Sequence, residues 1–145
     1  MSYRTGHRCR IRMELVAQLG HLRGDRATGY ELVLPLNPDG QIDATSWLDQ
    51  PQACRVRQFR QGRVERHGVL ARTPRGRWYF DYGSGRNAEE GEGLSGDHFV
   101  RGQFIAVAED DGKLRTYRIS SVDALTEPAA AGEAGSGRVD RPDER

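Results

Sequence analysis

Residues 98–122 read HFVRGQFIAVAEDDGKLRTYRISSV, and this stretch decides the fold class of the chain. Two runs in which apolar and polar residues alternate lie on either side of the dipeptide Asp111-Gly112. Alternation with a period of two is typical of a half-buried β-strand, and Asp-Gly between two such runs is a strong hairpin signal. The stretch therefore predicts two antiparallel strands, and no residue in it suggests catalysis.

Two pairing registers fit this hairpin. A two-residue turn at Asp111-Gly112 would place Ala106 opposite Tyr117, whereas a three-residue loop would place Ile105 opposite Tyr117. We favour the two-residue turn because a small side chain then faces a large one on the packed side of the sheet.

Alternating runs of the same kind recur upstream and predict further strands. A short helix over residues 44–48, with Asp43 as its N-cap, interrupts them, and Trp47 and Leu48 would dock it on the barrel as a lid. Residues 20–29 are polar and predict a loop. The strands are expected at residues 8–19, 30–36, 54–60, 63–72 and 77–82.

Two segments depart from this pattern. Residues 83–97 read GSGRNAEEGEGLSGD, with five glycines and a single large apolar side chain, and predict a long acidic loop. Residues 125–145 contain no aromatic side chain and bury too little apolar surface to offset the entropy cost of ordering, so we expect a disordered tail. The folded domain is accordingly expected at residues 3–124.

These elements predict an all-β fold. Short turns connect about seven strands in sequence, and closing the sheet removes its exposed edges. We therefore expect a small antiparallel β-barrel of SH3/OB-like size, with one short helix and a disordered C-terminal tail. A domain of about 120 residues buries enough of its unfolded surface to fold without disulfides or metals.

Composition indicates a soluble protein of the cytoplasm. The chain has 145 residues, which is typical of one domain, and its two cysteines, Cys9 and Cys54, are expected to be reduced and buried. The N-terminus lacks the apolar core of a secretory signal, and no apolar run is long enough to span a membrane. Arginine outnumbers lysine by 21 to one, which is typical of a GC-rich bacterial genome.

Charge is unevenly distributed along the chain. Residues 1–80 hold 14 arginines and 7 acidic residues, whereas residues 81–145 hold 8 basic and 14 acidic residues, so the net charge of +1 hides two opposed halves. Adjacent predicted strands in the basic half would gather arginines and aromatic rings on one surface. The candidate binding residues on this surface are Arg55, Arg57, Arg63, Arg66, Arg77 and Tyr79.

A basic surface of this kind suits two classes of partner. We expect a non-catalytic binding module that contacts an acidic protein partner. The alternative is single-stranded nucleic acid, whose phosphates the arginines would hold while Phe59 and Tyr79 stack on the bases. It also stays open that the arginines form a solvated outer face, or pair with the acidic residues at 89–92. The sequence does not fix the oligomeric state.

Catalytic and metal-binding signals are weak. Asp97, His98 and the nearby serines lack a nucleophile-elbow motif, so we expect no catalytic residues, and a small enzyme with a pocket near residues 83–97 is the third alternative. A metal site would need closely spaced ligands, which the sequence lacks, so we expect neither a metal nor a cofactor. The ligand types present are His7, Cys9, Cys54, His67 and His98.

Overall fold

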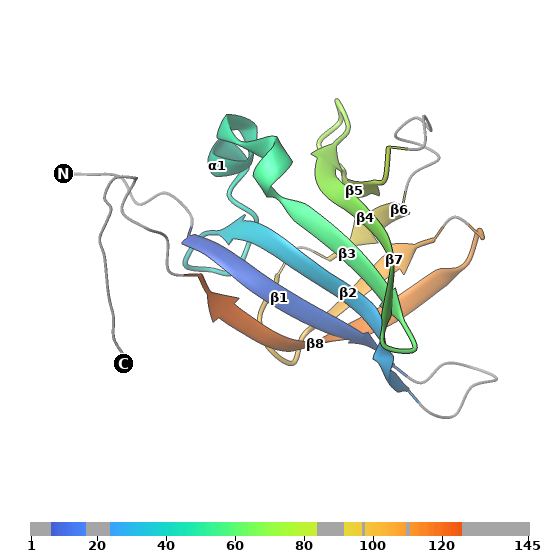
Figure 1. Ribbon diagram of the computed structural model, residues 1–145. Helices are drawn as coiled ribbons and strands as arrows, with labels where there is room; N and C mark the ends of the chain where they lie inside the picture. Colours follow the sequence, from blue (N-terminus) through green and yellow to red (C-terminus); the bar gives the residue numbers. More distant parts are fainter. Residues whose placement is uncertain (1–6, 17–23, 84–91, 97, 110, 126–145) are drawn as a thin grey trace.

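The computed structural model describes residues 7–16, 24–83, 92–96, 98–109 and 111–125, and within them the chain is a closed antiparallel β-barrel. Each strand pairs with the next one in sequence, and β8 returns to pair with β1 (Figure 1). The all-β barrel is thereby confirmed, although these residues form eight strands where about seven were expected. The strands are β1 (His7–Leu15), β2 (Asp25–Leu36), β3 (Arg55–Arg60), β4 (Arg63–Arg72), β5 (Trp78–Asp81), β6 (Glu92–Ser95), β7 (Phe104–Ala108) and β8 (Leu114–Ala124); the helices are α1 (Ala44–Asp49) and the 3-10 helix η1 (Pro51–Ala53).

The additional strand, β6, lies within the stretch predicted as an acidic loop. Leu94, its large apolar residue, is buried and pairs with Val107 of β7. The loop prediction for residues 83–97 is therefore wrong for this strand, while residues 84–91 and 97 lie outside the described part of the chain. β6 joins β5 to β7, and because the barrel needs this strand to close, tertiary pairing outweighs the low strand propensity of a glycine-rich segment.

The terminal hairpin adopts the three-residue register, so the favoured two-residue turn is wrong. Ile105 lies opposite Tyr117, and the backbone N–H of Gly112 donates to the carbonyl of Glu109 at 2.9 Å. Gly112 has a φ of +85°, and a glycine in this left-handed conformation is characteristic of a three-residue hairpin loop. The register decides which side chains enter the barrel, because Ile105, Glu109 and Tyr117 are all buried.

β2 begins earlier than predicted. It starts at Asp25, so residues 25–29 belong to a strand and not to the predicted polar loop. The carboxylate of Asp25 accepts hydrogen bonds from the backbone N–H of Ala27 (2.8 Å) and from the hydroxyl of Thr28 (2.6 Å), which fixes the start of the strand. Residues 17–23, which precede it, lie outside the described residues.

The predicted helix is confirmed in α1, which lies beside the β2–β3 side of the barrel (Figure 1). Asp43 caps it by accepting hydrogen bonds from two backbone N–H groups of the first turn. Trp47 docks as predicted: its indole N–H donates to a backbone carbonyl of β4 at 2.9 Å, and its ring meets Trp78 edge-on at 5.2 Å. Leu48 does not dock, since it is 71% exposed. Neither helix of the described chain is long and apolar enough to cross a membrane.

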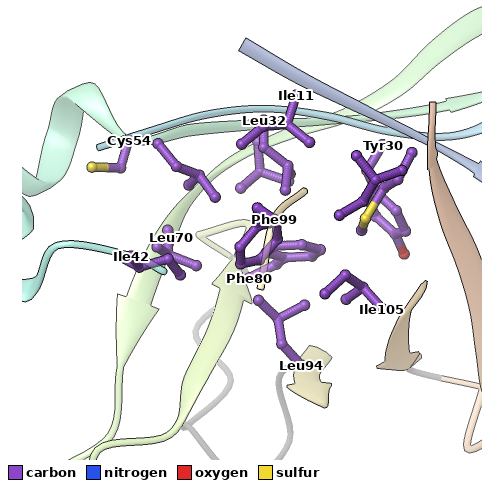
Figure 2. Packing of buried hydrophobic residues seen from close by; sticks show 14 of the residues in the cluster. Ile11, Tyr30, Leu32, Ile42, Cys54, Leu70, Phe80, Leu94, Phe99 and Ile105 are labelled. Carbon is purple, nitrogen blue, oxygen red and sulfur yellow. The ribbon is translucent and has the colours of Figure 1, made fainter. Parts of the chain in front are cut away.

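Side chains fill the centre of the barrel (Figure 2). Alternate residues of β1 and β2, such as Ile11 and Leu32, are fully buried. Phe99 also enters this core although it lies before β7 and outside any strand, and its backbone N–H donates to the carbonyl of Gly40 at 2.8 Å. Because side chains fill the interior in this way, the places left for a functional site are the outer surface and the buried polar groups.

Candidate functional site

The outer face of β1 to β4 brings arginines from separate strands together. Arg10 of β1 pairs with Val33 of β2, and Arg55 of β3 pairs with Val69 of β4. The residues on either side of Arg10 and the residue after Arg55 are buried, so the two-residue period of a strand turns both arginines outward. Basic and apolar side chains therefore alternate across the four strands.

A hollow of about 570 Å3, which we call the β1–β4 hollow, opens on this face. Val33 and Val69, both half-buried, supply apolar surface beside the arginines. η1 contributes one side chain, and the β3–β4 ladder places His67 opposite Arg57. The polar and charged residues that line the hollow are Arg10, Glu31, Gln52, Arg55, Arg57 and His67.

Positive charge dominates this hollow. Glu31 forms ion pairs with Arg57 at 2.7 Å and with Arg12 at 3.4 Å, so its carboxylate is already neutralised. Arg10 and Arg55 form no ion pair among the described residues, although Asp123 lies opposite Arg10 in the β1–β8 ladder. Two exposed guanidinium groups are therefore available to an anionic ligand.

The structure places only two of the six predicted binding residues in the hollow, Arg55 and Arg57. Arg63 begins β4 at the turn that follows β3. Arg77 and Tyr79 lie at β5, beyond the hollow, where the guanidinium of Arg77 approaches the backbone of β6. The predicted surface is thus divided between separate parts of the barrel wall.

Arg66, the sixth predicted residue, turns toward the barrel interior. Its Nε donates to the side-chain oxygen of Gln58 at 2.7 Å, and Gln58 is 4% exposed. Its guanidinium also lies 3.9 Å from the centre of the Tyr82 ring. Arg66 therefore belongs to the internal packing of the barrel and does not line the β1–β4 hollow.

The aromatic rings expected to stack on bases are not in the hollow. Phe59 is 6% exposed, because the guanidinium of Arg12 lies 4.2 Å from the centre of its ring. Tyr79 is half-buried and belongs to β5, outside the lining of the hollow. The described residues that line the β1–β4 hollow include no aromatic ring, so it lacks the stacking surface that single-stranded nucleic acid usually requires.

Sequence reasoning missed Arg10 and Gln52 as members of the site, and it considered His67 only as a metal ligand. The alternation around Arg10 predicts that it points outward, but its place in the same hollow as Arg55 depends on the order of β1, β2 and β3. Gln52 comes from η1, for which the sequence analysis had no prediction.

No family model, curated protein or solved structure shows significant similarity to the chain.

Metal and thiol chemistry have little support in the described residues. Among them, no group of three His, Cys, Asp or Glu side chains is placed to hold a metal ion. Cys9 and Cys54 are buried, as predicted, and neither forms a disulfide. Burial raises the pKa of both thiols, which keeps them protonated and poorly nucleophilic.

A buried polar cluster around Glu109 is the other notable group of functional side chains. Glu109 is 8% exposed, and its Oε2 accepts hydrogen bonds from the hydroxyls of Tyr30 (2.6 Å) and Tyr117. Its Oε1 accepts a hydrogen bond from Arg115 at 2.6 Å, and Gln58 donates to the Tyr30 hydroxyl at 3.3 Å. Both carboxylate oxygens are thus bonded by this chain's own side chains.

Burial and the neighbouring Glu109 carboxylate raise the pKa of Tyr117 well above its ordinary value. The phenol therefore stays neutral and serves as a hydrogen-bond donor. Since Glu109 lines neither the β1–β4 hollow nor the second hollow described below, the cluster suits stabilisation of the barrel better than catalysis.

Proposed function

We propose that this protein is a non-catalytic binding module whose β1–β4 hollow holds an acidic segment of a protein partner. The observation that carries the proposal is the pair Arg10 and Arg55, two exposed arginines of one hollow that form no ion pair among the described residues. Carboxylates of the partner would balance their charge, and an apolar side chain of the partner would cover Val33 and Val69.

The spacing of β3 suits an extended acidic segment. Arg55 and Arg57 project from the same face of one strand, and two residues along a strand span about 6.6 Å. Alternate side chains of an extended peptide repeat at the same distance. An acidic residue of the partner would therefore face Arg55, and the side chain two positions along would reach Arg57, which already pairs with Glu31.

Two other functions have less support. Single-stranded nucleic acid would gain charge neutralisation in this hollow but no stacking, because Phe59 is covered by Arg12. For an enzyme, residues 84–91 of the expected pocket lie outside the described chain, and the buried carboxylate of Glu109 already has both oxygens bonded. An acidic protein segment is the ligand that uses both the charge and the apolar surface present.

The proposal is tested with a fluorescein-labelled peptide in which glutamate and valine alternate. Fluorescence anisotropy would compare the wild type with the charge-reversed variant R10E/R55E. Neither arginine has an ion pair among the described residues, and the reversal at position 10 sets a like charge opposite Asp123 only at the exposed surface, so the variant should lose less than about 1 kcal/mol of stability. We expect the affinity for the peptide to fall by about tenfold or more.

A second charge-reversed variant, R63E/R75E, is the matched control. It changes the net charge by the same amount at exposed positions in the turns at either end of β4. The control should bind the peptide as the wild type does. Equal loss in both variants would show that only net charge matters, and no loss in R10E/R55E would refute the proposed site.

A further inference from the structure

Phe104 is the most exposed of the described phenylalanine and tryptophan rings. It lies on the outer face of β7 with 57% of its surface exposed. Other surface rings are covered by arginines, as Phe59 is by Arg12 and Trp78 is by Arg72. The face of the Phe104 ring therefore remains open to a ligand.

One arginine lies beside this ring, and a second lies in the turn before β7. Arg118 lies directly opposite Phe104 in the β7–β8 ladder, and directly opposite side chains lie about 5 Å apart at their Cβ atoms. Arg101 lies in the turn before β7, next to Val100, which is 44% exposed. Neither Arg101 nor Arg118 forms an ion pair in the part of the chain that the structure describes, and Glu14, which lies opposite Arg118 in the β1–β8 ladder, is paired with other arginines.

A hollow of about 510 Å3, which we call the β8–β1 hollow, opens beside this pair. A β-bulge shapes it: Arg12 pairs with Ser121 and Met13 pairs with Ile119, which leaves Ser120 without a partner in the ladder. The polar and charged residues that line this hollow are Glu14, Arg26, Arg101, Arg118 and Ser120.

Among the described lining residues, the one carboxylate does not cancel the positive charge of the β8–β1 hollow. Glu14 forms ion pairs with Arg12 at 2.8 Å and with Arg26 at 3.7 Å. Arg101 and Arg118 therefore keep their charges for a ligand. The β8–β1 hollow supplies available cations, and the exposed ring of Phe104 lies opposite one of them, Arg118, in the β7–β8 ladder, although Phe104 does not itself line the hollow.

We infer that the face formed by β7, β8 and the β8–β1 hollow binds single-stranded nucleic acid. An unpaired base stacks on Phe104, and the phosphates on either side of it lie against Arg118 and Arg101. The carboxylates of an acidic protein segment would pair with the arginines, but such a segment offers no base to stack on the Phe104 ring. The inference does not depend on the acidic-protein site, because the two hollows share no lining residue.

The stacking contact is tested with a fluorescein-labelled oligothymidine of about a dozen nucleotides at about 50 mM salt. Phe104→Ala should weaken binding by about 5- to 150-fold, the range that corresponds to the loss of one stacked base. Phe104→Tyr should bind as the wild type does. Leu114→Ala is the matched control, because Leu114 is also an apolar residue of this hairpin and is 62% exposed.

The phosphate contacts are tested by the salt dependence of binding. Each phosphate contact on a single strand contributes about 0.7 to the slope of log affinity against log salt, so R101A/R118A should reduce the slope by about 1.4. R63A/R75A removes the same charge elsewhere and should leave the slope close to that of the wild type. Phe104→Ala should keep the wild-type slope, because it removes a ring and no charge.

Three results would overturn the inference. The first is no binding of the wild type to oligothymidine at low salt, and the second is equal affinity of Phe104→Ala and Leu114→Ala. The third is loss of binding in R10E/R55E with binding intact in Phe104→Ala. The last result would place the strand in the β1–β4 hollow. The glutamate–valine peptide tests only the β1–β4 hollow, and oligothymidine tests only the face at Phe104. Failure of the nucleic-acid inference therefore does not affect the acidic-protein proposal.

Discussion

Tyr30 donates a buried hydrogen bond of 2.6 Å to Glu109, a residue 79 positions further along the chain. The bond joins β2 to the start of the β7–β8 loop, which lies on the opposite wall of the barrel. Tyr117 and Arg115 hold the same carboxylate from β8. One carboxyl side chain thus ties strands that the backbone ladder does not pair with each other.

Replacing Glu109 should be among the most destabilising polar substitutions in the barrel. Glu109→Gln keeps the shape but removes the charge that Arg115 and the two tyrosines share, and it turns one acceptor into a donor facing a donor. We expect a loss of about 2–4 kcal/mol in the free energy of unfolding, measured by urea denaturation. Glu65→Gln is the control, since its ion pair with Arg60 is exposed and should contribute less than about 1 kcal/mol. Equal effects would contradict the importance of the buried cluster.

Stability should fall at alkaline pH because of Tyr117. Its pKa is raised in the folded protein, whereas in the unfolded chain it lies at about 10. The stabilisation is therefore complete below about pH 10 and is lost as pH rises toward the folded pKa, since the unfolded state releases the proton first. Unfolding by urea from pH 8 to 11 would measure this, and Tyr117→Phe should flatten the decline. An equally steep decline in that variant would assign the effect to another group.

Two glycines should differ sharply in their response to alanine. A Cβ at Gly29 would collide with the backbone carbonyl of Met13 in the β1–β2 ladder, and the backbone on both sides is held by hydrogen bonds. A Cβ at Gly112 would meet no atom within 4 Å, so a side chain there is disfavoured only by the backbone φ of +85°. We expect about 3 kcal/mol of destabilisation for Gly29→Ala and about 1–2 kcal/mol for Gly112→Ala, measured by thermal unfolding. The reverse order would mean that the strand pair accommodates the methyl group.

The docking of α1 should depend on the indole N–H of Trp47. Trp47→Phe keeps an aromatic ring against Trp78 but removes the hydrogen bond to the carbonyl of Leu70, at an expected cost of about 1 kcal/mol. Leu48→Ala should change the free energy of unfolding by less than about 0.5 kcal/mol, because Leu48 is exposed. Chemical denaturation of both variants measures the difference. A larger effect of Leu48→Ala would mean that the helix docks through its other face.

The fold could be predicted wherever the local pattern was strong. Alternation and turn chemistry were sufficient for the β3–β4 ladder, for α1 with its Asp43 cap, and for the existence of the final hairpin. β6 could not be predicted in this way, because Leu94 is its only large apolar residue and its pairing depends on β5 and β7. The hairpin register depended on the backbone conformation of Gly112, which an Asp-Gly dipeptide does not specify.

The candidate site was harder to predict than the fold. Arg55 and Arg57 follow from alternation along one strand, and alternation from the buried Leu70 also places Arg66 on the inner face. To predict that Arg10 and Arg55 line the same hollow, one needs the strand order around the barrel. To predict that Phe104 is exposed, one needs the correct hairpin register. Sequence periodicity therefore predicts which way a side chain points better than it predicts which neighbour it meets.

The pairing of β8 with β1 also constrains how the chain can fold. Ser120 of β8 bonds to the backbone carbonyl of Arg12 of β1, 108 residues earlier. During synthesis, β1 has to wait for β8 to leave the ribosome before this side of it can pair, and until then it presents an open edge with apolar residues on one face. Closure of the barrel is therefore a late folding event, and it carries the entropy cost of closing a loop of more than a hundred residues. We expect slow folding, during which the open edge of β1 has to be protected from pairing with other chains.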